Sequence, residues 1–395
     1  MSQPPTNPIP FSEPPYLCGL PSPYYTASHR RFQKACRDFM WEHLLRHALE
    51  YERAGEVPEH VYTTFCKHNM LLPNMGAPLP VEWLHRLGIY DILGVKVEEW
   101  DYMYSGIYFD ELARSGLAGP GSSLNAGFTF AIPPILKYAS PEFQERFLPE
   151  LLTGQKRCCI AITEPEAGSD VANITTTATK TADGKYYIVN GTKKWITNGI
   201  WSSYATMAVR TGPPGAAGLS VLLVPLQNQP GVSMRRLHVS GQLTSGTTYI
   251  TLEDVHVPVT NLIGPENHGM QIIMKNFNHE RLSIAVGVTR SARVALSTAF
   301  AYCLRREAFG KALMEQAVVR HRLAKAGAEL ETMWAFLEQL LYQLCHLEKE
   351  EADRRLGAEV PGARIPGGSE DVLLDLAVRQ LVKIYTRGEG EKARM

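Results

Sequence analysis

The segment Ile160–Asp170, which reads IAITEPEAGSD, decides the interpretation of this chain together with NGTKKWITNG at residues 190–199. In the first segment a β-branched strand runs into a turn that offers hydroxyl groups at Thr163 and Ser169. Gly168 lets the backbone approach closely, and free N–H groups on such a turn can hold an anion or the polar edge of a ring. A polar loop that simply follows a strand gives the same pattern, so this segment alone leaves both interpretations open.

The second segment places an aromatic ring close to a hydroxyl group. Trp195 and Thr197 are two residues apart, so a regular strand would carry both side chains on one face. This pair suits a flat heteroaromatic ring, because the indole can pack on the ring while the hydroxyl bonds a ring nitrogen. A core tryptophan before a hairpin turn is the alternative.

The sequence around both segments, residues 157–264, alternates β-branched runs with tight-turn dipeptides. Asp-Gly at residues 183–184 and Asn-Gly at 190–191 and 198–199 can supply the positive φ angles of hairpin turns. The pattern predicts a compact antiparallel β domain.

Both flanks of this domain read as helical, because apolar residues recur at helical spacing among charged ones. Ser140 followed by Pro141 is expected to begin a helix, whereas the Gly/Ser-rich residues 115–127 are expected to form a connecting loop. Helices, then a sheet, then helices argue for an α+β fold with segregated layers. The predicted divisions are a Pro-rich arm at residues 1–26, an α-helical domain at 27–156, the β domain at 157–264 and a C-terminal helical bundle at 265–395, with helices over 266–304, 313–352 and 370–395.

The composition excludes several functional classes. The 395 residues carry 40 Lys+Arg and 40 Asp+Glu, so the charge balance gives no indication of nucleic-acid binding. Apolar runs stop well short of the roughly 20 residues that a membrane-spanning helix needs, and the seven cysteines form no CxxC pair, which fits a reducing intracellular compartment. There is no zinc-spaced Cys/His cluster, HExxH, GxSxG, P-loop or strand-flanked GxGxxG, so no metal site, hydrolase, kinase or Rossmann dehydrogenase is indicated.

Three motifs in the order TEPxAGSD at residues 163–170, NGxKxWITNG at 190–199 and RxxFGKxL at 306–313 closely resemble the acyl-CoA dehydrogenase superfamily. The match runs from about residue 30 to the end and looks most like the fungal members. The resemblance implies the fold of that family, FAD as cofactor, and α,β-dehydrogenation of a long, branched or otherwise bulky acyl-CoA thioester. It also implies an electron acceptor, either an electron-transfer flavoprotein or O2, and a homodimer or homotetramer.

The resemblance also assigns roles to particular residues. Trp195 is expected to lie against the flavin and Thr197 to bond its N5 side, while Arg306 with Phe309 is expected to reach the FAD of a neighbouring subunit. The expected cofactor contacts are Ile160, Ile162, Thr163, Ser169, Trp195, Ile196, Thr197, Arg306, Phe309 and Gln316. The expected substrate contacts are Ser169, Asn278 and Arg281.

The catalytic base is sought among carboxylates. Desaturation of an acyl thioester needs a carboxylate that removes the α proton while a hydride leaves the β carbon, in a site dry enough to raise the carboxyl pKa. Family members carry this Glu either in a loop beyond the position where this chain stops or on the helix after the β domain, directly before an Arg. Residues 276–282 read NFNHERL, so the resemblance implies that Glu280 is the base. A solvated Glu paired with a nearby Arg is the alternative.

Three departures from the family pattern accompany this match. A QIFGGxG-like segment that closes over FAD is not found before Met395, so the C-terminal domain is expected to be incomplete. A glutamine that often lies near FAD is displaced to Gln316, and the loop at residues 240–248 reads SGQLTSGTT without the usual Met-Gly start.

Four interpretations follow. The first is the dehydrogenase, and the second is the same chemistry with O2 as acceptor. The third is a flavin oxygenase with a non-CoA substrate, against which Glu280 argues, and the fourth is a truncated non-catalytic chain. The terminal residues 393–395, Ala-Arg-Met, resemble a peroxisomal address, so a peroxisomal location is expected if this signal acts and a cytosolic one otherwise. The first 25 residues contain no Lys or Arg, which argues against mitochondrial import.

Overall fold

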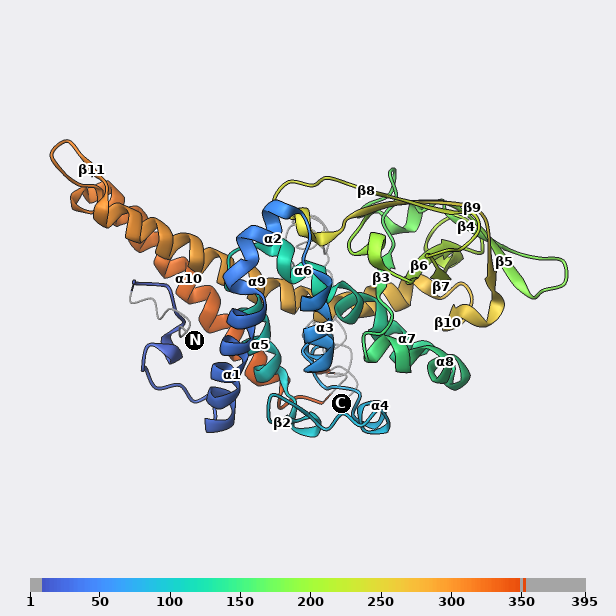
Figure 1. Ribbon diagram of the computed structural model, residues 1–395, viewed down its shortest axis with the longest axis horizontal. Helices are drawn as coiled ribbons and strands as arrows, with labels where there is room; N and C mark the ends of the chain where they lie inside the picture. Colours follow the sequence, from blue (N-terminus) through green and yellow to red (C-terminus); the bar gives the residue numbers. More distant parts are fainter. Residues whose placement is uncertain (1–8, 349–350, 353–395) are drawn as a thin grey trace, which may run out of the picture.

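The computed structural model describes residues 9–348 and 351–352, with helices before and after a central sheet (Figure 1). The strands of the sheet are β3 (Cys158–Ala161), β4 (Thr177–Lys180), β5 (Tyr186–Ile196), β6 (Tyr204–Arg210), β7 (Leu219–Pro225), β8 (Val232–Arg236), β9 (Thr248–Pro258) and β10 (Leu262–Ile263). Their order is β10-β7-β6-β4-β5-β9-β8, and β3 pairs with β6 outside this path. The predicted α+β class is confirmed.

The sheet is mainly antiparallel, but β3 departs from the predicted antiparallel pattern. It runs parallel to β6, with Cys158 opposite Tyr204 and Ala161 opposite Met207. A parallel pair needs a long connection, and here the connection contains both β4 and β5. The carboxyl end of β3 therefore does not close into a hairpin and instead opens into the TEPEAGSD turn.

Only part of the turn prediction is correct. Gly184 has a φ of 68° in the tight connection between β4 and β5, as expected. Asn190 and Gly191, however, lie inside β5 where its register shifts, so the prediction of a turn there was wrong. The Asn190 side chain donates to the Oδ1 of Asp254 on β9 at 3.0 Å, and a Cβ on Gly191 would lie 2.7 Å from the Cα of Thr176. This pair forms a β bulge.

A group of shorter helices precedes the sheet. They are α1 (Ala27–His43), α2 (Ala48–Ala54), α3 (Glu59–Lys67), α4 (Val81–Arg86), α5 (Tyr102–Leu112), α6 (Ala118–Ala126), α7 (Ile132–Tyr138) and α8 (Pro141–Leu152), with a small hairpin of β1 (Asp91–Ile92) and β2 (Val95–Lys96). The predicted start of α8 is confirmed, since the Ser140 hydroxyl accepts from the backbone N–H of Phe143 at 3.3 Å.

The Gly/Ser-rich residues 115–127 are mostly helical, so the prediction of a connecting loop was wrong. They form α6, which continues through the π-helical turn η5 (Gly127–Ala131) into α7. A Cβ on Gly127 would lie 2.5 Å from the carbonyl oxygen of Cys158. The small residues therefore allow this helix to pack closely on β3.

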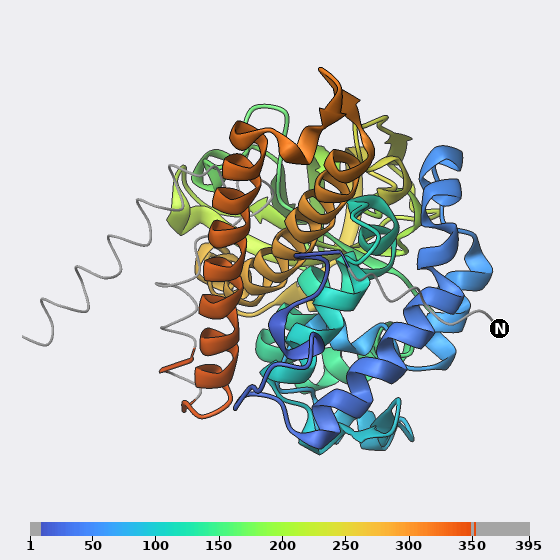
Figure 2. The same cartoon turned by 90° about the vertical axis from the view of Figure 1, so that its left-hand side faces the viewer.

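Two long helices follow the sheet and pack against each other. They are α9 (Gly269–Arg305) and α10 (Ala317–Leu344), joined by the hairpin of β11 (Glu307–Ala308) and β12 (Lys311–Ala312). Figures 1 and 2 show this hairpin at the tip of a projection that leads away from the body of the molecule. Within the described residues, no helix has the length and apolar character to cross a membrane. The predicted helix over 370–395 and the terminal Ala-Arg-Met lie outside those residues.

The sheet separates two apolar clusters. Alternate residues of β6 and β7 point to opposite faces, as strand geometry requires. Ala208 and Val221 belong to the cluster shared with the helices, whereas Met207 and Leu222 belong to the cluster on the other face. The helix α9 thus packs on the helix-facing side of β6 and β7.

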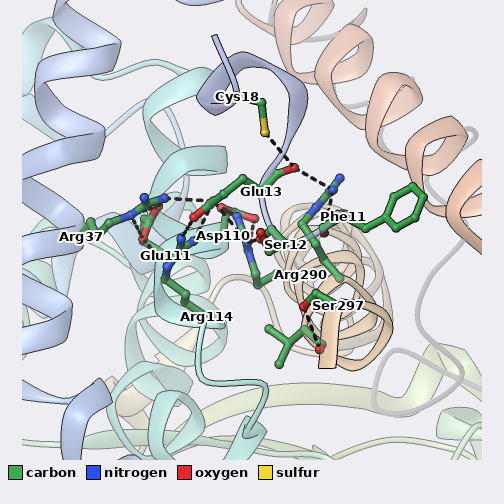
Figure 3. Close-up of polar contacts among 12 residues, drawn as sticks. Phe11, Ser12, Glu13, Cys18, Arg37, Asp110, Glu111, Arg114, Arg290 and Ser297 are labelled. Carbon is green, nitrogen blue, oxygen red and sulfur yellow. Dashed lines mark hydrogen bonds and ion pairs between the residues drawn. The ribbon is translucent and has the colours of Figure 1, made fainter. Parts of the chain in front are cut away.

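The N-terminal arm lies against α9 over its described part (Figure 3). Arg290 donates to the carbonyl oxygen of Ser12 at 3.0 Å, and Arg293 donates to that of Phe11 at 3.1 Å. Both guanidinium groups are buried, and the Nε of Arg290 also donates to the Oδ1 of Asp110 at 2.7 Å. The surrounding ion pairs in Figure 3 join Glu13, Arg37, Glu111 and Arg114.

Candidate active site

The two segments that the sequence singled out lie next to each other where β3 and β5 end. The backbone N–H of Lys194 donates to the carbonyl oxygen of Thr163 at 2.9 Å. Thr163 opens the TEPEAGSD turn just after β3, and Lys194 directly precedes Trp195. The structure therefore brings the Thr163 turn and the indole together.

A buried ion pair lies beneath this junction. The Nζ of Lys193 donates to the Oε1 of Glu164 at 2.8 Å and to the carbonyl oxygen of Ile162 at 2.9 Å. Glu164 is 3% exposed and Lys193 is 0% exposed. Burial by itself raises the pKa of Glu164, but the Lys193 charge and the hydrogen bonds outweigh it and lower the pKa to about 2. Burial lowers the pKa of Lys193 to about 8, against the opposing effect of Glu164.

Glu164 also fixes the backbone that follows the turn. Its Oε2 accepts from the N–H and the hydroxyl of Thr175 at 2.6 Å and 2.9 Å, and its Oε1 accepts from the N–H of Thr176 at 3.0 Å. The pairing of this carboxylate with Lys193 was not predicted from the sequence. The burial of Lys193 could have been predicted from the alternation along β5. Lys193 lies an even number of residues from the buried Tyr187 and Val189, so its side chain is expected on the same face of the strand.

Trp195 lies in a second bulge of β5. The register with β9 shifts between Lys193 and Ile196, and Trp195 itself has a φ of 63° with a side chain that is 51% exposed. A left-handed backbone costs a bulky residue about 1–2 kcal/mol. The prediction that Trp195 and Thr197 share one face of a regular strand was therefore wrong, because the bulge turns the chain between them and β5 ends at Ile196.

Asn198 joins the end of β5 to the helical domain. It is 4% exposed with a φ of 62°, and it starts the 3-10 turn η7 (Gly199–Trp201) rather than the predicted hairpin turn. Its side-chain amide donates to the carbonyl oxygens of Ser122 on α6 at 3.0 Å and of Ser245 at 2.9 Å. The segment from Trp195 to Asn198 is thus held between the sheet and α6.

A narrow cavity of about 10 Å³, roughly the space of one water molecule, lies between β3 and the first turns of α9. The two predicted cofactor residues Ile160 and Ile162 line it from β3, and Asn276 lines it from α9. The remaining lining residues are Pro134, Thr206, Ala208, Val221, Ile272 and Ile273. This cavity connects the wall made by the motif segments with the helix that carries Glu280.

Glu280 is a buried carboxyl on α9, 2% exposed. The side-chain amide of Asn276, one turn earlier, donates to its Oε1 at 2.8 Å. Burial raises the pKa of Glu280 well above its usual range, although the Arg281 charge and the hydrogen bond from Asn276 act to lower it. The sequence-predicted base therefore occupies a dry environment that favours its neutral form, which does not match the alternative of a solvated surface Glu.

The predicted substrate contacts fall in different environments. Arg281 is buried beside Glu280 on α9, with 5% of its surface exposed. Ser169 is exposed on the TEPEAGSD turn, after β3. The side chain of Asn278 lies outside the described part of the chain.

Three predicted cofactor residues lie away from this junction. Arg306 ends α9, and Phe309, 98% exposed with a φ of 55°, lies at the tip of the hairpin between β11 and β12. Gln316 is half-buried just before α10. The projection in Figure 1 carries these residues far from β5 of the same chain.

The residues at the junction fit a flat aromatic cofactor. An exposed indole held in a backbone conformation that tryptophan rarely adopts has one face free for stacking. The half-buried Thr163 and Thr197 offer hydroxyls to the polar edge of such a ring. With the buried carboxyl of Glu280 on α9, one helical turn from the cavity-lining Asn276, this arrangement is suited to removing a proton beside a redox-active ring.

Comparison with known proteins agrees over almost the whole chain. Models of the acyl-CoA dehydrogenase N-terminal, middle and C-terminal domains match residues 26–155, 159–255 and 267–358. The chain is 68% identical to acyl-CoA dehydrogenase apdG of Emericella nidulans over 98% of this chain and 99% of that protein. It is 30% identical to the mitochondrial long-chain specific acyl-CoA dehydrogenase of Sus scrofa over 80% of this chain and 70% of that protein. The crystal structure of an acyl-CoA dehydrogenase from Geobacillus kaustophilus superposes with a TM-score of 0.74 at 28% identity, covering 91% of this chain and 100% of that one.

One of these alignments bears on the family segment that the sequence analysis did not find. The alignment with apdG spans 432 positions, which is more than the 395 residues of this chain. Some positions of that relative therefore have no counterpart here, and they fall inside the aligned span. The difference from this relative is thus internal to the chain.

Proposed function

This chain belongs to the acyl-CoA dehydrogenase family, and we propose that Glu280 is the base with which it desaturates its substrate. As a family member the chain is an FAD-dependent oxidoreductase that acts on a CH–CH bond of an acyl-CoA thioester. The observation that carries the proposal is the burial of Glu280 on α9, with a raised pKa, one helical turn from the cavity-lining Asn276.

The proposed reaction starts at the α carbon of the acyl thioester. The α C–H bond breaks heterolytically, its proton passes to Glu280, and its electron pair becomes the new C=C bond as a hydride leaves the β carbon. Bound FAD supplies the acceptor for that hydride. A carboxyl with a raised pKa suits this step, because a base is most effective when its pKa lies near the operating pH.

The β domain is proposed to hold the cofactor. Trp195 offers an exposed face for stacking, and the half-buried Thr163 and Thr197 belong to the same junction, since Lys194 donates its backbone N–H to the Thr163 carbonyl. The buried pair of Glu164 and Lys193 fixes the backbone beneath them. This wall positions the ring without taking part in the proton transfer.

The proposed substrate is a long or branched acyl-CoA. The support is the likeness to a relative whose name describes it as specific for long chains. The proposed assembly is a homodimer or homotetramer, since Arg306 and the exposed Phe309 lie on a projection remote from Trp195 of the same chain (Figure 1). In that assembly the hairpin tip contacts the FAD of a neighbouring subunit.

Anaerobic bleaching of the flavin tests the base. Protein loaded with FAD is mixed with a panel of acyl-CoAs that runs from short straight chains to long and branched ones. Glu280→Gln is expected to retain FAD but to slow bleaching by about 10²–10⁴-fold, the usual contribution of a general base. Glu338→Gln is the matched control, because Glu338 is also a buried carboxyl with a raised pKa but lies on α10; it should bleach normally.

Two results would overturn the proposal. Unchanged bleaching in Glu280→Gln would remove Glu280 from the reaction, and a wild-type protein that takes up no FAD would remove the reaction itself. Reoxidation of the bleached protein by air or by an electron-transfer flavoprotein then identifies the electron acceptor, and light scattering after gel filtration gives the oligomeric state.

A further inference from the structure

The helix α7, which packs on α9 near Asn276, contains two consecutive prolines, Pro133 and Pro134, which leave carbonyl groups without their usual donors. In an α-helix the carbonyl of Phe130 accepts from the N–H of residue 134, and proline has no N–H. At this point the chain forms the π-helical turn η5 instead of a regular α-helix. The carbonyl oxygen of Phe130 is therefore free to accept a hydrogen bond from another element.

Asn276 on α9 takes up this carbonyl. Its Nδ2 donates to the carbonyl oxygen of Phe130 at 3.0 Å and to the Oε1 of Glu280 at 2.8 Å. A carbonyl oxygen can only accept, so the NH2 group of the amide must face Phe130, and its second N–H is then aimed at the carboxyl. The orientation of the Asn276 amide is therefore determined by its two acceptors, the Phe130 carbonyl and the Glu280 carboxyl.

Helix geometry brings the two side chains together. Asn276 and Glu280 are four residues apart, which places them on one face of α9. They are 3% and 2% exposed, so water cannot readily replace the bond between them. A buried hydrogen bond to a charged group is stronger than one between neutral groups.

We propose that Asn276 is a positioning residue that holds Oε1 of Glu280 and leaves Oε2 to take the α proton of the substrate. The inference rests on the proposed role of Glu280 as base. It makes the Pro133–Pro134 pair a determinant of the base geometry, because these prolines free the carbonyl that orients Asn276.

The charges around Glu280 bear on its titration. Arg281 on the same helix acts on it by charge, whereas η5 and β7, which also pack on α9, carry no titratable side chain. Titratable groups on the other packed helices include Lys137 and Tyr138 on α7, Asp110 and Glu111 on α5, and Glu331 and Glu338 on α10. The two α5 carboxylates and Glu331 are bound to arginines. A donated N–H favours the charged carboxylate, so removing it should raise the pKa of Glu280 further.

The first test replaces the amide with an apolar group of similar size. Asn276→Leu should raise the pH midpoint of anaerobic bleaching by about one unit and lower the maximal rate about tenfold with KM little changed. Asn261→Leu is the matched control, since Asn261 is a buried asparagine of the β domain that donates to the carbonyl oxygen of Leu223 at 2.8 Å. It should leave the midpoint unchanged.

The second test works through the prolines and needs no change to Asn276. Pro134→Ala restores an N–H that can bond the Phe130 carbonyl, so it should move the midpoint in the same direction by a smaller amount. Pro133→Ala restores an N–H that faces the carbonyl of Thr129, one residue earlier, and should leave the midpoint unchanged. Comparing Pro134→Ala with Pro133→Ala tests the inference even if Asn276→Leu fails to fold.

A readout independent of turnover separates this inference from the proposed function. Infrared difference spectra of each protein against its Glu280→Gln counterpart report the protonation of this carboxyl directly as the pH is varied. A carboxyl midpoint that moves in Asn276→Leu supports the inference even if no acyl-CoA bleaches the wild type, in which case only the proposed function fails. An unmoved midpoint, an equal shift in Asn261→Leu, or identical behaviour of the two proline variants would overturn the inference.

Discussion

Two glutamates, one in the β domain and one on α9, are both shielded from solvent, but their pKa values shift in opposite directions. Glu164 is 3% exposed with a pKa lowered to about 2, and Glu280 is 2% exposed with a pKa raised well above its usual range. Glu280 lies deeper in the protein than Glu164, so its burial raises the pKa more, and the partners of the two groups add to the difference. Glu164 faces an ammonium group, two backbone N–H groups and a hydroxyl. Among the described side chains, Glu280 accepts from the amide of Asn276 and is acted on by the Arg281 charge.

The comparison distinguishes a carboxylate that stabilises the backbone from one that can take up a proton. A fully paired carboxylate stays charged throughout the physiological range and can fix a backbone, but it has no tendency to take a proton. A carboxyl that burial has left poorly compensated takes a proton readily, which is the property a base requires. The wall proposed to hold the cofactor and the helix that carries the proposed base thus contain the same residue type with opposite pKa shifts.

The largest effect on the free energy of unfolding should come from breaking the ion pair between Lys193 and Glu164. Lys193→Met leaves the Glu164 carboxylate buried without its counter-charge, and we expect a loss of about 3–5 kcal/mol in the free energy of unfolding. Urea unfolding followed by circular dichroism measures it. The double variant Lys193→Met with Glu164→Gln removes both charges and should recover much of the loss; a double variant as unstable as the single one would contradict the pairing argument.

The next largest effect is the loss of folding stability at low pH, where Glu164 becomes protonated. The folded pKa of Glu164, about 2, lies below its usual value of 4.5. Stability from this group is therefore fully present above pH 4.5 and is lost as the pH falls toward 2, by about 3 kcal/mol. Comparing urea midpoints at pH 5 and pH 3 should show a smaller drop in Glu164→Gln than in the wild type, and equal drops would count against the proposed ionisation.

The other glutamate should show the reverse sign. The folded pKa of Glu280 is raised, so the stability that its proton provides is present at low pH and is lost as the pH rises from 4.5 through the folded pKa. Glu280→Gln stays neutral, and its apoprotein should be about 1–2 kcal/mol more stable than the wild type at pH 8 but equal to it near pH 4. Thermal unfolding at both pH values checks this; a variant less stable than the wild type at pH 8 would contradict it.

The smallest effect should come from the bulge that presents the indole. Trp195→Gly relieves the left-handed backbone, so the apoprotein should gain about 1 kcal/mol or less while FAD binds more weakly. Trp195→Ala removes the same ring but keeps a Cβ at positive φ. Equal thermal stability of the two variants would show that the backbone at this position is not strained.

The sequence was informative where the signal is local. Glu280 was singled out by the resemblance to the family, which places a Glu-Arg dipeptide on the helix after the β domain; its burial fits that expectation, and its role as base stays a prediction. The α+β order followed from hydrophobic periodicity. The start of α8 depends on the Ser140 hydroxyl, which accepts from the backbone N–H of Phe143, only three residues later. Each of these features depends on neighbours in the chain.

Features that depend on distant contacts could not be predicted in the same way. The Phe130 carbonyl that orients Asn276 is 146 residues away in the sequence. The small residues from 115 to 127 resemble a loop in composition, and only the approach of β3 makes them a closely packed helix. The bulge at Trp195 arises from the register between β5 and β9, which neither strand specifies alone.

The N-terminal arm has a consequence for how the chain is made. Ser12 and Phe11 accept hydrogen bonds from arginines that lie 278 and 282 positions later in the sequence. A ribosome that adds about 5–20 residues per second delivers those arginines roughly a quarter of a minute or more after the arm has emerged. The ion pairs of Glu13 with Arg37 and Arg114 join residues that are made early, whereas Arg290 and Arg293 can complete their contacts to the arm only once most of the polypeptide has been translated. The attachment of the arm is therefore completed in two stages of synthesis.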